Sequence, residues 1–219
     1  MNDPKFGLGR IAAPDPRDRM HMMPKKITTR RYRYWPAYRY WLDQGATPQC
    51  VAYSWSHFLV DAPMSHPLDL SPLIIYNEAQ KLDEWPGEDY EGTSVRAGAK
   101  VLKAHARVSS YQWAFDLETV IYHLLEVGPV IVGTNWYEQM FYPKPVAGTK
   151  AYKISIGGEI AGGHAYKLDG INLDLSFIRM KNSWGQSWAN RGFARISLSD
   201  VERLIAEDGE ACRAVEIGA

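Results

Sequence analysis

Residues 181–193 read KNSWGQSWANRGF, and this run is the most informative stretch of the sequence. The side-chain oxygen of Asn182 can accept a hydrogen bond from an imidazole N–H and so hold a histidine ring in one tautomer. Trp184 could cover that bond and keep water from competing for it. The alternative is structural: Asn182 and Ser183 make a turn, and Trp184 and Trp188 are an aromatic pair of the core or surface. The functional interpretation therefore needs a histidine that the fold brings close.

The candidate histidine is His164, in the segment GGHAYKLDG at the predicted start of a strand. The two glycines before it let a backbone or a substrate come close. A histidine taken alone is more often structural or solvated, and the sequence has five others: His21, His57, His66, His105 and His123. Its setting makes His164 the candidate base, which would pair with a nucleophile and later protonate a leaving group.

The candidate nucleophile is Cys50, which follows a loop containing Gly45 and Pro48 and begins the predicted helix CVAYSWSHFLV. Unpaired amides and the helix dipole at that end favour a thiolate, the reactive form of cysteine. The alternative is that Cys50 is a small buried apolar residue. Gln44, six residues earlier, could direct its carboxamide at a developing oxyanion, although alone it is an ordinary turn glutamine.

The first half of the chain predicts helices. Ser71-Pro72 opens a second one, Thr93 or Ser94 caps a third that runs through Ala104, and Asp116 caps a fourth that stops at Gly128-Pro129.

The second half predicts strands separated by turns, namely PVIVGTN, GHAYKLDGIN, LSFIRMKN and GFARIS, and then a short helix, SLSDVERLIAEDG. Segregated helices and strands predict an α+β fold, with a helical lobe at about 42–127 and a sheet lobe at about 128–219. We expect the active site in the cleft between the two lobes.

The N-terminal region differs in character. Residues 1–30 are rich in Pro, Gly, Arg and Met and predict an extended arm ahead of a domain at 31–219. Residues 31–41, RYRYWPAYRYW, interleave arginines and aromatics with the period of a strand. This stretch could bind a nucleic acid or another anionic partner. We prefer an amphipathic strand with its aromatics packed on the domain and its arginines outward, and keep segment 30–41 as a candidate surface for a protein partner.

Composition limits the function classes. Lys plus Arg and Asp plus Glu number 25 each, so the net charge gives no reason to expect nucleic acid or membrane as partner. Two cysteines make a disulfide framework implausible, and the first residues have no apolar signal region, so we expect a cytoplasmic protein or one packaged in, or released with, a larger assembly. The histidines lack zinc spacing and there is no Gly-rich phosphate loop, so we expect neither a metal nor an organic cofactor.

Together these motifs resemble the papain-like cysteine peptidase family over about residues 32–200. The resemblance is carried by Gln44-Gly45 before Cys50, Ala52-Tyr53-Ser54, Gly128-Pro129-Val130, Gly163-His164-Ala165 and the run from Lys181 through Gly185, with Trp188 and Gly192-Phe193. It implies a two-lobe fold and peptide-bond hydrolysis. Cys50 would be the nucleophile, His164 the base, Asn182 the residue that orients the base, and Gln44 a donor to the oxyanion.

The resemblance also implies substrate contacts. Gly92 would hydrogen-bond the substrate backbone, and Trp184 would border the cleft. Gly133, Gly162 and Ala165 fall near positions that line the pocket for the second residue before the scissile bond, with Gly163 beside them. Because these residues are small, we expect a roomy pocket for a large apolar side chain.

The sequence departs from the family pattern at four places. Thr47 replaces a disulfide cysteine of secreted members, Pro48 a glycine and Val51 a tryptophan, and Glu91-Gly92-Thr93 keeps one glycine of a pair. The 43 residues before Gln44 contain nothing that resembles the long inhibitory propeptide of the family. We therefore expect that the enzyme is made active, that residues 1–30 restrain it, or that a partner does.

Two other functions stay open. One is a papain-fold binding or structural subunit with little or no catalysis, since fold does not fix function. The other is an amidase or acyl transferase on the same scaffold. The intact set of Cys50, His164, Asn182 and Gln44 argues against the first, and the run that follows Lys181 favours a peptidase over the second.

Overall fold

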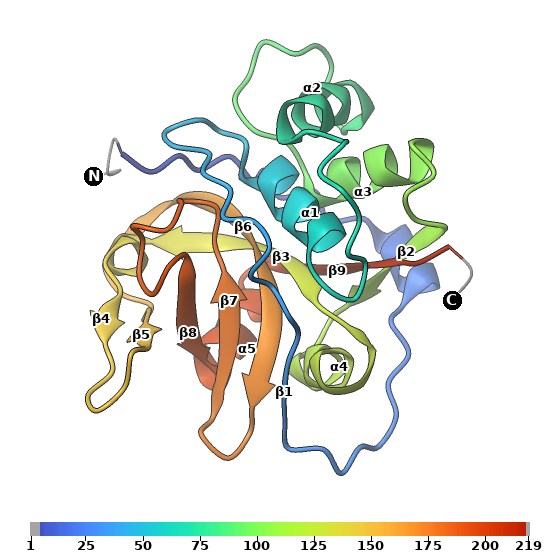
Figure 1. Cartoon of the computed structure of the whole chain (residues 1–219). Coiled ribbons are helices and arrows are strands. Elements are labelled where there is room, and N and C mark those ends of the chain that lie inside the picture. Colours follow the sequence, from blue (N-terminus) through green and yellow to red (C-terminus); the bar gives the residue numbers. More distant parts are fainter. Residues whose placement is uncertain (1–4, 218–219) are drawn as a thin grey trace.

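The computed structural model describes residues 5–217, with three α-helices gathered in one half and the sheet in the other (Figure 1). The helical half consists of α1 (Cys50–Val60), α2 (Pro72–Leu82) and α3 (Val95–Ala104). Two helices pack on the sheet half: α4 (Leu117–Tyr122), which continues as the π-helical turn η2 (His123–Val127), and α5 (Leu198–Ala206). The predicted α+β fold is confirmed.

Side-chain caps begin the helices where the sequence predicts them. Ser71, Ser94 and Asp116 accept hydrogen bonds from backbone amides in the first turns of α2, α3 and α4. Such a cap stabilises a helix by about 1 kcal/mol. By contrast, Gln49 makes no side-chain cap on α1, so the first turn of the helix that carries Cys50 lacks that partner.

The described strands form one nine-stranded sheet in the order β2-β9-β3-β6-β7-β8-β5-β4, with β1 paired to β6. The pairings are antiparallel except for that of β5 with β8. The strand bounds are β1 Tyr32–Tyr34, β2 Ser110–Ala114, β3 Val130–Tyr137, β4 Lys144–Pro145, β5 Tyr152–Lys153, β6 Ile160–Asn172, β7 Phe177–Lys181, β8 Phe193–Ser197 and β9 Glu210–Val215.

Strand β1 does not face the way the sequence predicts. Tyr32 and Tyr34 are exposed, and Arg33 between them is half-buried with its guanidinium 3.8 Å from the ring centroid of Trp35. The expected orientation is therefore wrong for Tyr32 and Arg33, whereas Trp35 is buried as expected and the ring of Tyr34, although 41% exposed, lies 6.5 Å from that of Phe177. The cation–π contact with buried Trp35 turns the arginine toward the domain instead.

A buried ion cluster joins the two halves. Asp61, the residue after α1, contacts the ammonium groups of Lys167 on β6 and Lys181 on β7, the latter at 2.8 Å. All three side chains are 0–1% exposed. Burial, with the neighbouring charge of Lys167, lowers the pKa of Lys181 to about 8. The shared carboxylate of Asp61 lowers the free-energy cost of burying both ammonium groups.

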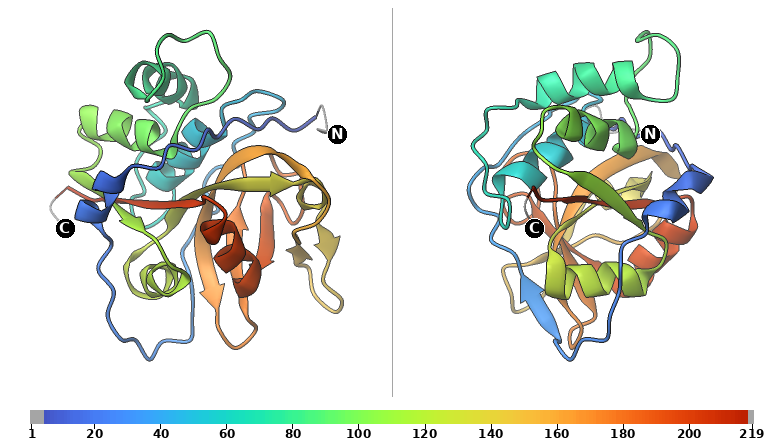
Figure 2. Two further views of the ribbon diagram at one scale, coloured as in Figure 1. Left: turned by 180° about the vertical axis from the view of Figure 1, so that it is seen from behind. Right: turned by 90° about the vertical axis from the view of Figure 1, so that its right-hand side faces the viewer.

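The first described residues run as an extended segment between the helical and the sheet half, as Figure 2 shows. From here on, the arm means residues 5–13, which are a part of the N-terminal arm predicted over residues 1–30. After it comes the 3-10 helix η1 (Pro16–His21), and the chain then passes below the helices to reach β1 (Figures 1 and 2). The arm contains buried Arg10 and Ala13, so it is part of the packed molecule.

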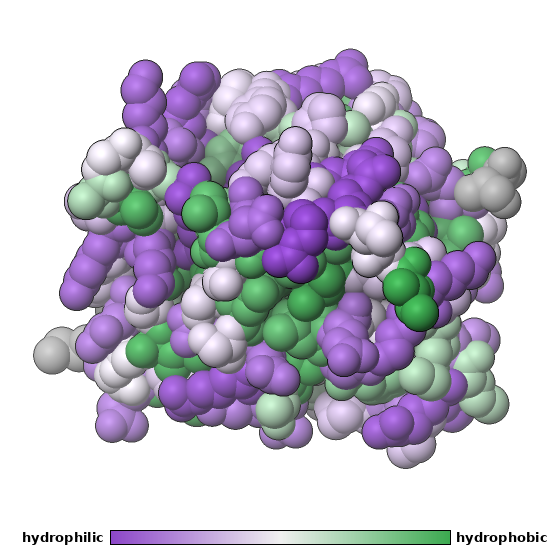
Figure 3. Space-filling model, turned by 90° about the horizontal axis from the view of Figure 1, so that it is seen from below, coloured by the Kyte–Doolittle hydropathy of each residue, from purple (hydrophilic) through white to green (hydrophobic). Residues whose placement is uncertain are grey.

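The face opposite α1, α2 and α3 has an apolar centre. Seen from below, apolar residues gather at its centre and hydrophilic residues surround them (Figure 3). No helix in residues 5–217 has both the length and the apolarity that crossing a bilayer requires.

We expect Asp61→Asn to destabilise the protein by about 3–5 kcal/mol, because it leaves two buried lysines without their shared counter-charge. Urea unfolding measures this change. The matched control is Asp174→Asn, which removes an exposed carboxylate paired with exposed Arg31 and should change stability by about 0.5 kcal/mol or less. Equal effects of the two substitutions would contradict the role given to the cluster.

Candidate active site

Cys50 is the first residue of α1 and is 0% exposed. Its Sγ accepts a hydrogen bond from the backbone N–H of Ala165 at 3.3 Å. This contact joins the beginning of α1 to β6 at the residue that follows His164. The structure thus brings together the predicted nucleophile and the strand that carries the predicted base.

His164 is held by Asn182. The His164 Nε2 lies 2.8 Å from Asn182 Oδ1, and the same oxygen accepts the backbone N–H of Ser183 at 2.8 Å. Because Asn182 Oδ1 acts as an acceptor in both contacts, His164 Nε2 carries the proton of the neutral ring and Nδ1 is the basic nitrogen. His164 Nδ1 has no hydrogen-bond partner among the described residues.

Two tryptophans enclose the imidazole. The Trp184 ring stacks on His164 with centroids 4.6 Å apart, and Trp136 meets it edge-on at 4.7 Å. Both indoles are at most 1% exposed. The His164–Asn182 bond is therefore shielded from water, as the sequence predicts for Trp184.

Burial also sets the protonation of the pair. It raises the pKa of Cys50 to about 12 and lowers that of His164 to about 4, although the bond to Asn182 acts in the opposite direction on His164. Both shifts disfavour charge. At neutral pH this state therefore contains a thiol and a neutral imidazole.

Gln44 directs its amide at a peptide carbonyl. Its Oε1 accepts the hydroxyl of Ser183 at 2.7 Å, and its Nε2 donates to the carbonyl oxygen of Thr47 at 2.7 Å, an acceptor that fixes which end of the carboxamide is the donor. Its Nε2 donates to the carbonyl oxygen of Gly7 at 3.1 Å, and Trp184 Nε1 donates to the same oxygen at 3.2 Å. Two predicted site residues therefore already bind a peptide carbonyl, one that belongs to the arm.

The arm continues across the site through backbone bonds. The N–H groups of Gly9 and Arg10 both donate to the carbonyl of Gly163 at 3.0 Å. On the opposite side Thr93 N–H donates to Gly9 at 2.9 Å, and Ile11 N–H donates to Thr93 at 3.0 Å. The arm is thus hydrogen-bonded to both halves of the molecule.

The predicted substrate-binding glycines lie against the arm. A Cβ on Gly163 would be 2.0 Å from the Arg10 carbonyl oxygen, and one on Gly92 would be 2.3 Å from that of Gly9. A Cβ on Gly162 would be 2.9 Å from Leu8 Cδ1. These three positions leave space for a backbone, and here the arm occupies it.

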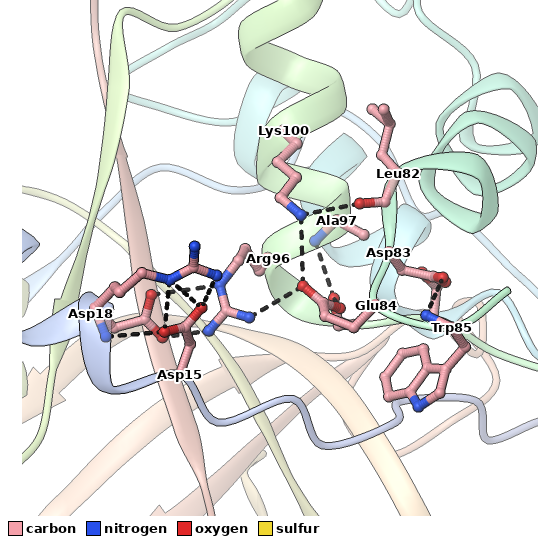
Figure 4. A network of polar contacts seen from close by, with 12 residues as sticks. Asp15, Asp18, Leu82, Asp83, Glu84, Trp85, Arg96, Ala97 and Lys100 are labelled. Carbon is pink, nitrogen blue, oxygen red and sulfur yellow. Dashed lines mark hydrogen bonds and ion pairs between the residues drawn. The ribbon is translucent and has the colours of Figure 1, made fainter.

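A second attachment lies beyond the arm. Asp18 of η1 pairs with buried Arg96 on α3, which also donates to Glu84 at 3.0 Å (Figure 4). Figure 4 shows the guanidinium of Arg96 between the two carboxylates. This pairing anchors the segment that follows the arm to the helical half.

The pocket beside Gly133 differs from the one expected. It contains the side chain of Arg10, whose Nε donates to Glu210 at 2.9 Å and whose Nη2 donates to the carbonyl of Asp208 at 2.6 Å. We expected a roomy pocket for a large apolar side chain, but the space beside Gly133 contains an arginine that is paired with a carboxylate. Sequence reasoning missed Glu210, because it lies in a strand, EACRAV, whose charged residues hide the apolar pattern.

No three or more His, Cys, Asp or Glu residues within positions 5–217 are grouped so that they could hold a metal ion.

Comparison with known proteins agrees with this geometry. Residues 72–211 match the family described as papain family cysteine protease, a match that includes His164 and Asn182 and begins after Cys50. Cathepsin B-like cysteine proteinase 3 of Caenorhabditis elegans is 25% identical over 169 residues, which are 73% of this chain and 40% of that protein. Cathepsin B-like cysteine proteinase 6 of the same organism is 32% identical over 104 residues, 46% of this chain and 26% of that one. The chain thus spans less than half the length of these relatives.

Solved structures share the fold at low identity. Xylellain, a cysteine protease from Xylella fastidiosa, aligns with a TM-score of 0.72 at 15% identity over 99% of both chains. Digestive procathepsin L 3 of Tenebrio molitor aligns with a TM-score of 0.64 at 14% identity, over 97% of this chain and 76% of that one. The family match covers residues 72–211, which is more than half of the sequence. This chain therefore belongs to the papain family of cysteine proteases.

Proposed function

We propose that this protein is a cysteine endopeptidase that hydrolyses peptide bonds through Cys50, His164 and Asn182 and a thioester intermediate. The observation that carries the proposal is the 2.8 Å bond from His164 Nε2 to Asn182, which leaves the basic Nδ1 of His164 unbonded next to the strand residue that contacts Cys50 Sγ. The fold alone would not support this function, because one fold can host many different activities.

In the first half-reaction, Cys50 Sγ attacks the carbonyl carbon and its proton passes to His164 Nδ1. The negative oxygen accepts hydrogen bonds from Gln44 Nε2 and the Cys50 backbone N–H. The C–N bond then breaks, and the proton on His164 goes to the departing amine, leaving an acyl group on Cys50.

In the second half-reaction, a water molecule loses a proton to His164 Nδ1 and attacks the thioester carbonyl. The C–S bond breaks, the acid leaves, and the proton returns to sulfur. Asn182 acts in both halves by holding the ring so that Nδ1 faces the reaction.

In the described state the arm blocks this reaction. Cys50 and His164 are each 0% exposed, so no substrate reaches them, and the same burial opposes the thiolate–imidazolium pair that the reaction needs. Of the three explanations left open by the sequence, these contacts support restraint by residues within 1–30. We infer that catalysis requires the arm to leave.

We expect the double variant Gly7→Ala/Gly9→Ala to hydrolyse a fluorogenic peptide at least ~10-fold faster than the unmodified protein, because the arm loses several backbone bonds of about 1 kcal/mol each. The added Cβ atoms would lie 2.0 Å from Thr47 O and 2.1 Å from Pro48 O, so the arm cannot keep its place.

The control for this experiment is Met20→Ala, which changes a side chain that is 72% exposed beyond the arm and should leave the rate as it is. Adding Cys50→Ala to the double variant should abolish hydrolysis. Activity that persists without Cys50 would refute the proposed nucleophile, and an inactive double variant with native stability would refute the peptidase proposal.

The second prediction concerns pH. A thiol is alkylated as its thiolate, and a pKa of about 12 leaves little thiolate at neutral pH, so iodoacetamide should label covered Cys50 slowly and faster as pH rises. In Gly7→Ala/Gly9→Ala, water and His164 can stabilise the thiolate, so labelling at neutral pH should be at least ~100-fold faster. Peptide mapping separates Cys50 from the second buried cysteine, Cys212, whose labelling should not change. Equal pH profiles in both proteins would contradict the effect assigned to the arm.

A further inference from the structure

A groove in the sheet half lies apart from the catalytic residues. Its lining comes from segment 34–41, from residues 146–153, and from β7, β8 and the turns before these two strands. It consists of three adjoining cavities of about 450, 360 and 350 Å³, and the largest shares Phe177 and Arg195 with the second and Arg179 with the third. We call it the basic groove. None of the residues assigned to catalysis lines any of the three cavities.

Positive charge is concentrated in the basic groove. Its lining contains no aspartate or glutamate but five cationic residues, namely Lys150, Lys153, Arg179, Arg191 and Arg195. Within residues 5–217, Arg179 alone among these five forms an ion pair, with buried Asp169 at 2.6 Å. The chain as a whole has no net charge, so this local excess of unpaired cations marks the surface for an anionic partner.

Aromatic rings hold two of these arginines in place. The guanidinium carbon of Arg195 lies 4.1 Å from the ring centroid of Phe177, and that of Arg191 lies 4.7 Å from the ring centroid of Trp41. A guanidinium that already rests on a ring loses less conformational freedom when it binds a carboxylate, and it can offer that carboxylate two N–H donors. The groove therefore presents cations that are positioned for acidic groups.

The rings also indicate which class of anionic partner fits. A single-stranded nucleic acid binds a basic groove by stacking its bases on free aromatic faces. Here arginines occupy a face of Phe177 and of Trp41, and the rings of Phe177 and Phe193 are 7% and 6% exposed. Exposed apolar surface comes instead from Tyr38 and Leu175, which are 59% and 63% exposed and line different cavities. Cations interspersed with such side chains are complementary to a polypeptide in which acidic and apolar residues are mixed.

We propose that the basic groove docks an extended acidic segment of a protein partner. Carboxylates of that segment would pair with Lys153, Arg191 and Arg195, and its apolar side chains would pack on Tyr38 and Leu175. A row of three cavities can take successive side chains of an extended chain. This docking goes beyond the peptidase function and does not depend on it, because no catalytic residue takes part.

Fluorescence anisotropy tests the proposal with a fluorescein-labelled peptide in which glutamate and leucine alternate. The full chain carries Cys50→Ala, so that the probe stays intact. We expect Lys153→Glu/Arg191→Glu, at exposed positions in the two outer cavities, to weaken binding at least ~10-fold through charge repulsion. The control is Lys81→Glu/Lys103→Glu, which makes the same change of net charge at exposed positions on α2 and α3 in the helical half (Figure 1). It should change the affinity by about twofold or less, because charges far from the groove are screened.

A peptide with glutamine in place of glutamate should bind the protein with the intact groove at least ~10-fold more weakly. This comparison does not depend on the folding of any groove variant. If the acidic peptide does not bind, if the glutamine peptide binds equally well, or if both double variants weaken binding equally, the groove does not select acidic segments and the proposal is wrong.

Two other occupants would also overturn the proposal. One is a nucleic acid, shown by a single-stranded oligonucleotide that binds more tightly than the acidic peptide and loses affinity in Lys153→Glu/Arg191→Glu. The other is a second copy of this chain, shown by self-association in sedimentation that the same two substitutions abolish.

Discussion

The geometry of the site depends on how α1 is held against the sheet at both ends. At its C-terminal end, one carboxylate, Asp61, is shared by Lys167 and Lys181. At its other end, Cys50 accepts the amide of Ala165. Lys167 lies on the same strand as His164, and Lys181 immediately precedes Asn182. The ion cluster therefore holds the elements that carry Cys50, His164 and Asn182 against one another.

Burial of the site also determines which protonation states of Cys50 and His164 are favoured. Trp136 and Trp184 enclose His164, and the arm completes the exclusion of water from Cys50. With the arm in place, the environment favours neutral groups, and without it the beginning of α1 and the imidazole can support a charge pair. One segment, the arm, thus limits access to Cys50 in this structure and also favours the neutral forms of Cys50 and His164.

Much of the fold could be predicted from local chemistry. The caps at Ser71, Ser94 and Asp116 and the motifs around His164 and Asn182 depend on neighbours in sequence, so the sequence alone located them. Strand β9 was not predicted, because the charged residues Glu210 and Arg213 are buried in it and interrupt the apolar pattern of the sequence. The partner of Glu210 is Arg10, from a distant part of the chain, whereas Arg213 pairs with nearby Glu216.

The position of the arm could not be predicted from the sequence either, for a different reason. Its contacts to Gly163, Thr93 and Gly45 are made by backbone groups, which no residue pattern reveals. The glycines of the site were correctly singled out as places of close approach, but what approaches them in this state is the protein itself. The outward tyrosines of β1 show the same limit, because Trp35 and not the strand period decides which side chain turns inward.

The direction of the arm determines how its peptide bonds are oriented in the site. The arm runs from Gly7, beside Gln44 and Trp184, to Arg10 in the Glu210 pocket. A substrate whose second residue before the scissile bond fills that pocket would run from the pocket toward Cys50, with the opposite polarity. The arm therefore lies in the site with its peptide bonds reversed. Under the proposed function, it would cover Cys50 without presenting a bond in the orientation that the reaction cleaves, so the covered chain would stay uncut.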